Sequence, residues 1–205
     1  MAEPTFTPSG LGAKQWEELQ QMTPDAVCRR AAVRFDATQR WYAVNFMDIE
    51  YRVRVDEKRV EGPTGEALAA DSELQLLLLT YLLSAQDVPL SGTRVSERDL
   101  PGGNLFFRGP HALPTAPLIE RFGSAPEKFL DVGIVLGGSR IAYGDVAIEF
   151  LALPRIPVGC VLWAEDEEFP ARVTFLFDSS IHAHLPLDVV LALVRSVVTR
   201  VLEVA

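Results

Sequence analysis

The sequence contains very little cysteine. Only Cys28 and Cys160 occur among its 205 residues, and two distant cysteines provide neither a disulfide framework nor a spacing typical of metal ligands. Cys160 lies in an apolar run, where a thiol is most simply a small core residue. The N-terminal residues also lack the basic and apolar regions of a secretory signal. Reduced thiols and the missing signal together predict a cytoplasmic protein.

Long apolar runs and basic patches are missing as well. The longest apolar run, near residues 76–83, contains Thr80 and is too short to span a bilayer, so we expect no membrane role. The formal net charge is −9, whereas nucleic-acid binders usually carry a basic patch or stripe. The arginines and lysine of residues 52–59 are interrupted by acids, which predicts a solvated hairpin face rather than an anion site. We therefore expect no nucleic-acid partner.

Hydrophobic residues are abundant. They make up 48% of the chain, which excludes a disordered chain and is enough to fill the core of one domain of about 200 residues. Residues 1–12 are rich in proline and glycine, and we interpret them as a flexible tail. The remaining residues, 13–205, are predicted to form a single α+β domain.

Helices are predicted from hydrophobic periodicity and from capping residues. Thr23 and Pro24 suit the start of a helix, and Ser124–Glu127 has the pattern of a capping box. Asp71 is predicted to cap a helix that is apolar all round and therefore buried. The predicted helices cover about residues 13–22, 24–32, 74–83, 115–122, 124–137 and 187–204.

Strands are predicted in two regions. Alternating apolar residues from Trp41 to Val55 indicate a half-buried β-unit, which the turn sequence of residues 62–65 closes. Three further strands, at about 146–153, 158–163 and 173–177, are joined by short links that favour antiparallel neighbours. The predicted fold is α+β, with a mainly antiparallel sheet, helices packed on one face and a long C-terminal helix. A homodimer contact through that helix stays open as an alternative to packing on the sheet.

Several short motifs are similar to those of one known family. They are Leu100-Pro101-Gly102-Gly103, Arg121-Phe122-Gly123, Leu136-Gly137-Gly138, Tyr143-Gly144-Asp145, Leu153-Pro154-Arg155-Ile156-Pro157-Val158, Val161-Leu162-Trp163, Asp166-Glu167-Glu168-Phe169-Pro170, Leu176-Phe177-Asp178 and Leu185-Pro186. From about Trp16 to the last residue, the chain resembles the uncharacterised prokaryotic domain-of-unknown-function family number 3786. The resemblance implies relatives largely in anaerobic bacteria and archaea, some of them fused to a small cysteine-rich iron–sulfur domain. This chain has no N-terminal cysteine cluster, so no iron–sulfur site carries over, and the family supplies no catalytic residues.

Two of the three histidines lie between the last predicted strand and the C-terminal helix, a position where loops commonly hold binding residues. His182 and His184 could both ligate a metal, with Asp178 as an oxygen ligand. Ser179 or Ser180 with a histidine base would be a hydrolytic alternative, although no nucleophile elbow is present. The simpler interpretation is that Asp178 and the serines cap backbone N–H groups of a turn.

Four adjacent acids, residues 165–168, form a second candidate. They could bind a hard cation, but their spacing does not match a calcium loop, and acids in a turn between strands are usually solvated. If they folded back beside Asp178, like-charge repulsion would raise the pKa of one carboxyl. Phe175 and Phe177 alternate on one face of the neighbouring strand, which is typical of core packing.

The third candidate lies in residues 88–113, which are long for a connection without structure. Such segments are often functional or contain short strands. The glycines at 102 and 103 permit close backbone approach to a ligand. Phe107 supplies a stacking surface, and Arg108 with His111 could hold a carboxylate or phosphate. The alternative is a loop that packs its phenylalanine rings onto the core.

We interpret the chain as a cytosolic binding module with a small-molecule or cofactor pocket between residues 102–111 and 177–184; the cofactor itself is unidentified. One alternative is an enzyme that uses Asp178, His182 or His184 as acid–base groups or metal ligands. Another is a protein-interaction domain that docks its C-terminal helix onto a partner from anaerobic redox or one-carbon metabolism. The predicted ligand-binding residues are Gly102, Gly103, Phe107, Arg108, Trp163, Glu167, Phe177, Asp178, His182 and His184.

Overall fold

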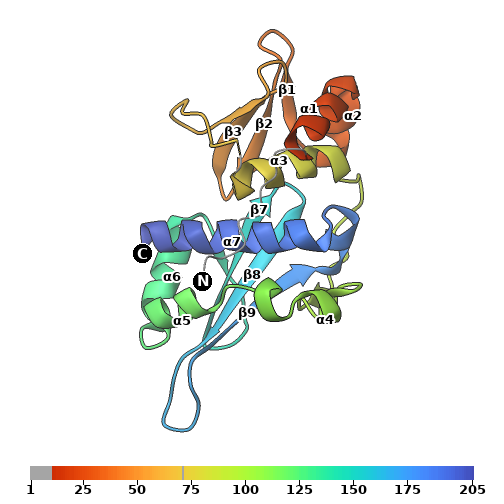
Figure 1. Cartoon of the computed structure of the whole chain (residues 1–205). Helices are drawn as coiled ribbons and strands as arrows, with labels where there is room; N and C mark the ends of the chain where they lie inside the picture. Colours follow the sequence, from red (N-terminus) through yellow and green to blue (C-terminus); the bar gives the residue numbers. More distant parts are fainter. Residues whose placement is uncertain (1–10, 71) are drawn as a thin grey trace, which may run out of the picture.

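The strands form two antiparallel sheets in a computed structural model, which describes residues 11–70 and 72–205 (Figure 1). The first sheet has the order β1-β2-β3-β4, with strands at Arg34–Asp36, Trp41–Phe46, Ile49–Arg54 and Arg59–Glu61. The second has the order β5-β9-β8-β7-β6, with strands at Arg94–Val95, Arg172–Asp178, Ile156–Trp163, Val146–Leu153 and Ser139–Arg140. The α+β class and the antiparallel pairing are confirmed, but the strands divide between two sheets.

Seven α-helices and two short 3-10 turns accompany the sheets in the described part of the chain. The α-helices are α1 (Leu11–Gln21), α2 (Pro24–Ala31), α3 (Glu73–Ser84), α4 (Gly103–Phe106), α5 (Ala116–Phe122), α6 (Pro126–Val135) and α7 (Leu187–Val204). The 3-10 turns are η1 (Gly109–His111) and η2 (Ser179–Ala183). Among these described residues, no helix is long and apolar enough to cross a membrane.

The capping predictions are the least accurate part of the helix assignment. Thr23 occupies the cap of α2 but its side chain makes no capping hydrogen bond. The capping box predicted from Ser124 is wrong, because Ala125 occupies the cap of α6 and no side chain caps that helix. Ser72 caps α3 by accepting a hydrogen bond from Gln75 N–H, while Asp71 lies outside the described residues. Residues 1–10 of the predicted tail also lie outside them, and α1 already begins at Leu11.

The long helix α7 lies at the centre of the molecule. It packs against α3, which lies beneath the first sheet, and it crosses the second sheet (Figure 1). Most of its apolar side chains, from Val189 to Val201, are buried. This position leaves α7 with little exposed apolar surface, so the helix lacks the free face that docking onto a partner would require.

Buried side chains from both sheets and from the long helices belong to one connected apolar cluster. The two sheets meet at the tight turn of Met47 and Asp48, where both residues have positive φ. Met47 N–H donates a hydrogen bond of 3.2 Å to the Ala152 carbonyl oxygen of β7. A connected core is what one domain requires, and a single domain over residues 13–205 stays a prediction.

The two faces of the second sheet differ. Residues on the inner face, such as Ile148, Cys160 and Phe175, are buried against α5, α6 and α7. Their neighbours along the strands point to the other side, as alternation requires, and there Glu149 and Thr174 are half-buried and Leu151 is exposed. The sheet therefore presents a mixed polar and apolar outer face.

Arg155 connects the second sheet to the N-terminal helices. It lies in the turn between β7 and β8, and its guanidinium donates hydrogen bonds to the carbonyl oxygens of Arg30 at 2.7 Å and Arg29 at 3.0 Å, at the end of α2. The same group bonds the Asp87 carboxylate at 2.5 Å. The Tyr81 hydroxyl lies beside it, accepting from Arg155 N–H at 3.1 Å. A single side chain thus satisfies helix-end carbonyls that otherwise lack partners.

Replacing Arg155 with alanine should destabilise the protein by about 2–4 kcal/mol, because carbonyl groups that are partly buried lose a charged donor. Urea unfolding followed by circular dichroism measures this difference. Arg34→Ala is the matched control, since Arg34 forms an ion pair with Glu50 while its side chain is 80% exposed, and it should cost less than about 1 kcal/mol. Equal effects of the two substitutions would contradict the anchoring role of Arg155.

Candidate functional site

Asp178 holds a turn together through local hydrogen bonds. One carboxylate oxygen accepts from the backbone N–H groups of Ser91 and Ser180, both at 2.9 Å, and from both serine hydroxyls. The other oxygen accepts from Gly92 N–H at 2.8 Å. Burial alone would raise the pKa of Asp178, but these hydrogen bonds outweigh it and hold the pKa well below its usual range. The carboxylate therefore fastens residues 91–92 to the end of β9.

The two histidines of the predicted site have different surroundings. His184 is 1% exposed; its Nδ1 accepts a hydrogen bond from Gln86 N–H at 3.2 Å, and its Nε2 has no partner among the described residues. Burial, and then the charge of Arg155, lower the pKa of His184. His182 is exposed, with Nδ1 at 2.5 Å from the Ser179 carbonyl oxygen. Within residues 11–70 and 72–205, no three His, Cys, Asp or Glu side chains are grouped to hold a metal ion.

The serines beside these histidines are also engaged locally. The Ser180 hydroxyl donates to Asp178 at 2.6 Å, and the Ser179 hydroxyl donates to the Ser91 hydroxyl at 2.8 Å. In the part of the chain that the structure describes, neither hydroxyl is hydrogen-bonded to a histidine ring. The geometry that a serine nucleophile with a histidine base requires is therefore not formed here.

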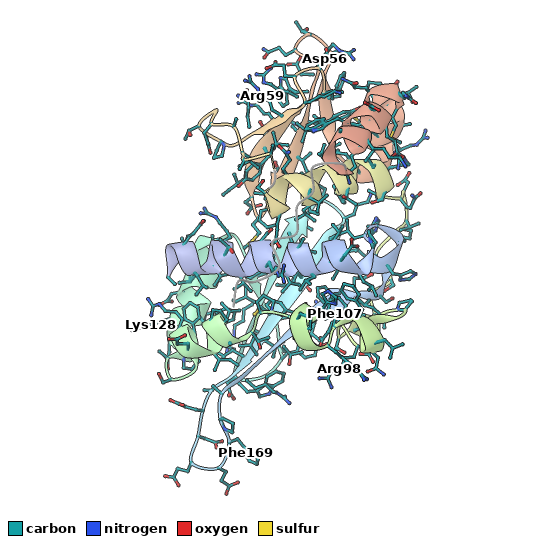
Figure 2. The ribbon with its side chains drawn as sticks, viewed as in Figure 1. Asp56, Arg59, Arg98, Phe107, Lys128 and Phe169 are labelled. Carbon is teal, nitrogen blue, oxygen red and sulfur yellow. The ribbon has the colours of Figure 1, made fainter. Side chains whose placement is uncertain are left out.

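Trp163, Glu167 and Phe177 lie in three separate places. Phe177 is fully buried on the inner face of the second sheet. Trp163 lies under the guanidinium of Arg172, whose central carbon is 4.0 Å from the ring centroid. Glu167 is exposed near the tip of the β8–β9 hairpin, where Figure 2 also shows Phe169. The acids of this tip therefore do not fold back beside Asp178.

The predicted glycine-rich loop forms α4 and η1. Gly102 has a φ of +78° at the start of α4, and a Cβ added to Gly103 would lie 1.9 Å from the Glu97 carbonyl oxygen. These glycines are needed for a turn and a close backbone contact within the fold. Arg108 is exposed and donates to the Asn104 side chain at 2.9 Å. Phe107, by contrast, is buried at the wall of a groove.

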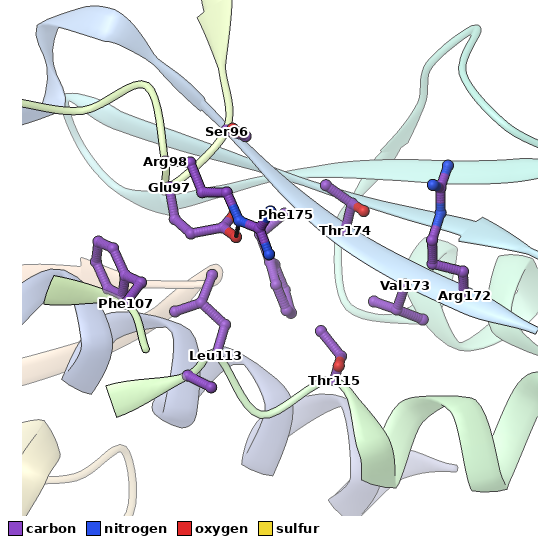
Figure 3. Close-up of a pocket in the computed structure, with 11 residues that line it drawn as sticks. Ser96, Glu97, Arg98, Phe107, Leu113, Thr115, Arg172, Val173, Thr174 and Phe175 are labelled. Carbon is purple, nitrogen blue, oxygen red and sulfur yellow. Dashed lines mark ion pairs between the residues drawn. The ribbon is translucent and has the colours of Figure 1, made fainter. Parts of the chain in front are cut away.

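This groove, called the β9 groove here, runs along the edge of β9 and has a volume of about 430 Å³ (Figure 3). Three segments line it: the turn after β5, the connection from α4 to α5, and β9 itself. The lining residues are Ser96, Glu97, Arg98, Phe107, Ala112, Leu113, Thr115, Arg172, Val173, Thr174 and Phe175. Of the ten residues predicted to bind a ligand, Phe107 alone is among them, so the structure does not bring the predicted set together.

Along most of the groove, β9 has no paired strand on the side away from β8 among the described residues. Strand β5 pairs only with Phe177 and Asp178, and Ser179 N–H donates to the Thr93 carbonyl oxygen at 2.8 Å. Because hydrogen-bonding groups alternate along an antiparallel strand, residues 175 and 173 direct their N–H and C=O groups to the same side as Ser179, away from β8. Among the described residues, none pairs with these groups, and both residues are buried, Val173 to 6% and Phe175 to 0% exposure with the backbone included.

Two arginines border the groove. Arg98 has a side chain that is 75% exposed and forms a 3.7 Å ion pair with Glu97, as Figure 3 shows. Arg172, at the other end, is exposed and stacks on Trp163. Leu113 and Phe107 supply apolar surface on the wall opposite β9. The groove therefore combines positive charge and apolar walls in a chain whose net charge is −9.

A second hollow, of about 540 Å³, lies at the base of the β8–β9 hairpin beside Trp163 and Phe169. Its polar groups are already bonded within the chain. Asp145 accepts from Ala164 N–H at 2.9 Å, and Asp166 accepts from two N–H groups of the hairpin tip. Because Arg172 already covers the Trp163 ring, this hollow offers a ligand fewer free partners than the β9 groove.

Most lining residues of the β9 groove escaped prediction because they are ordinary strand and loop residues. Thr174 and Val173 are typical of any strand, and nothing in the residue types of Ser96 or Leu113 indicates binding. The unusual length of residues 88–113 was the available signal. It indicated short strands, and the two-residue strand β5 lies within it, together with the helical turns α4 and η1, which were not predicted.

A family model described as "Domain of unknown function (DUF3786)" matches residues 23–200. The chain belongs to this family. The match covers the two sheets, the β9 groove and almost all of α7, and it agrees with the resemblance drawn from the sequence motifs. Searches for similar curated proteins and for similar solved structures gave no significant match.

Asp178→Asn should destabilise the protein at pH 7 by about 2 kcal/mol or more, because the neutral amide replaces a charged acceptor of five hydrogen bonds with a weaker one. The folded-state pKa is lowered, so this stabilisation is present above about pH 3.9, the unfolded value, and is lost as the pH falls further. Urea unfolding at pH 7 and pH 3 measures the free energy of unfolding of wild type and variant. The difference between these two free energies should be smaller at pH 3. Asp131→Asn, at an exposed position, is the control, and its free energy of unfolding should equal that of wild type at both pH values.

His184→Gln should flatten the dependence of stability on pH in weak acid. The lowered pKa of His184 means that the unfolded chain binds this proton first, so wild-type stability should fall as the pH drops below about 6.5, the unfolded value. Thermal unfolding from pH 7.5 to pH 5 measures the slope. His111→Gln removes an exposed histidine and should retain the wild-type slope. A variant slope equal to that of wild type would show that His184 protonation does not couple to unfolding.

Proposed function

We infer that this chain is a ligand-binding module whose ligand lies in the β9 groove. The observation that carries the proposal is a groove whose apolar wall, with Leu113 and Phe107, is bordered by Arg98 and Arg172. Apolar walls with a few placed charged or polar groups are typical of ligand sites. The groove volume of about 430 Å³ also lies in the range of known ligand sites.

The proposal keeps one part of the pocket predicted from sequence and moves the rest. The predicted pocket lay between residues 102–111 and 177–184. In the proposed site, Phe107 still supplies one wall, but the opposite wall is the preceding strand, at residues 172–175. The cytoplasmic location and the link to anaerobic redox or one-carbon metabolism stay predictions.

The lining of the β9 groove favours binding over catalysis. Glu97 provides the carboxylate of the groove, and this carboxylate already forms an ion pair with Arg98. The Ser96 hydroxyl donates to Asp99 at 2.7 Å. Of the described residues that line the groove, none is a histidine or a cysteine. The side chains supply charge, hydrogen bonds and apolar contact, which are the means of holding a ligand in a defined orientation.

The proposal is tested by nuclear magnetic resonance of the ¹⁵N-labelled protein with three small probes: hexanoate, phenylacetate and N-acetyl-valyl-glutamate. We expect weak binding, with a Kd of about 1 mM, and amide shifts concentrated at residues 96–98 and 173–175. Ala112→Trp should abolish these shifts, because Ala112 is an exposed residue that lines the groove and the indole would occupy it.

Ala116→Trp is the matched control. It adds the same ring at an exposed position in the first turn of α5, outside the groove lining, and should leave the shifts unchanged. The proposal fails if none of the probes shifts the amides of residues 173–175, or if both tryptophan variants behave like wild type.

A further inference from the structure

We propose that the ligand of the β9 groove is an organic acid, an apolar body with a single carboxylate that Arg98 binds. This inference rests on the proposed function and names the chemical class of its ligand. Three features of the lining support it: the free donors of Arg98, the balance of charge, and the exposed part of the apolar wall.

Arg98 presents unused donors at the groove. Its side chain is 75% exposed, and its one ion pair among the described residues is long, from Nε to Glu97 Oε1 at 3.7 Å. The two terminal nitrogens, Nη1 and Nη2, donate to no described residue. Figure 3 shows the guanidinium lying between Glu97 and Phe175. Because a guanidinium binds a carboxylate through two parallel N–H···O bonds, a ligand carboxylate would be held by both free nitrogens.

The other polar side chains of the lining add donors more than acceptors. The Thr115 and Thr174 hydroxyls form no hydrogen bond to another described residue, and each can donate to a ligand. Glu97 is the one acid of the lining, and its carboxylate already faces Arg98. A lining with free donors and an engaged carboxylate favours an anion over a cation.

The balance of charge indicates a single negative charge on the ligand. Arg98 and Arg172 bring two positive charges to the lining and Glu97 brings one negative charge, so one positive charge is left to neutralise. A carboxylate carries one negative charge at pH 7, whereas a phosphate monoester carries about −1.5 to −2. The chain as a whole has a net charge of −9 and does not offset the additional charge of a phosphate. The lining therefore favours a carboxylic acid.

Arg172 acts from the other end of the groove. Its guanidinium stacks on Trp163, with the central carbon 4.0 Å from the ring centroid, and Figure 3 shows its side chain directed away from Arg98. Among the described residues, no carboxylate forms an ion pair with Arg172, so its charge adds to the positive potential of the groove. We expect it to attract the ligand without holding the carboxylate.

The apolar body of the ligand would lie on the wall opposite β9. There Ala112 is exposed and Leu113 is half-buried, so both have apolar surface that a ligand can cover. A ligand on this wall needs no access to the backbone of Val173 or Phe175, which the chain itself buries. Each methylene that becomes fully buried strengthens binding by up to about fourfold.

The first test compares hexanoate with hexanamide, which has the same length but no charge, by nuclear magnetic resonance titration of the ¹⁵N-labelled wild-type protein at pH 7. Hexanamide should bind about fivefold or more weakly, because it loses the charge-assisted bonds to Arg98. Butanoate, shorter by two methylenes, should bind about fourfold more weakly than hexanoate. Added salt should weaken hexanoate alone. Equal affinities of hexanoate and hexanamide would overturn the inference, and this comparison uses unmodified protein.

The second test changes the arginines. Arg98→Gln should weaken hexanoate by about fivefold or more and leave hexanamide unchanged, so that the two probes bind alike. Arg98→Lys keeps the charge but loses the paired N–H groups, and it should restore only part of the affinity. Arg172→Gln should weaken hexanoate by about twofold.

Arg108→Gln is the matched control. It removes the same charge at another exposed arginine that lies close in sequence but outside the groove lining, and it should leave both affinities unchanged. A loss equal to that of Arg98→Gln would show that hexanoate responds to the net charge of the protein, which contradicts the inference.

The outcomes separate this inference from the proposed function. If hexanoate and hexanamide shift the amides of residues 96–98 and 173–175 with equal affinity, the groove binds its ligand through apolar contact, and only the inference fails. If neither probe shifts these amides, the proposed function fails as well. A preference for hexanoate that disappears in Arg98→Gln supports both.

Discussion

The arrangement of the whole chain depends on the side chain of Arg155. It extends from a hairpin of the second sheet to the last carbonyls of α2 and to Asp87, so it ties together segments that are far apart in sequence. Tyr81 strengthens the connection, because its hydroxyl donates to the Ala31 carbonyl at 2.8 Å while it accepts from Arg155 N–H. The same anchor holds Asp87, at the start of the segment that leads from α3 to β5.

Local patterns predicted the long elements well. The bounds of β7 and α7 agree with the sequence prediction, because each is a long segment with a clear hydrophobic pattern and a defined start or stop. The division into two sheets could not be predicted in the same way. It depends on which strands have partners in space, and a strand such as β4, with three residues, has too little sequence to indicate a partner. The missing cap at Ser124 has a similar cause, since Ala125 adopts the capping position and the side chain of Ser124 is not used.

The candidate site shows a deeper limit of sequence analysis. The prediction relied on residue types that often carry chemistry, such as the aspartate and histidines of residues 178–184. Most of their polar atoms, however, are hydrogen-bonded within the fold. The β9 groove owes its binding potential to three segments that are distant in sequence, namely the turn after β5, the connection from α4 to α5, and β9. No local motif indicates that these segments meet. Val173 and Phe175 are indistinguishable in sequence from core residues of a fully paired strand, and only the topology shows that β5 ends before it reaches them.

The central position of α7 has a consequence for how the protein is made. This helix is the last described element to leave the ribosome, yet the buried leucines of α3 and the inner face of the second sheet both rest on it or on its neighbours. Until residue 204 has been synthesised, those apolar surfaces have no cover, and newly made chains expose them to one another. The first sheet, α3 and the second sheet therefore cannot complete their core one after another along the chain, because each depends on a helix that follows them all in sequence.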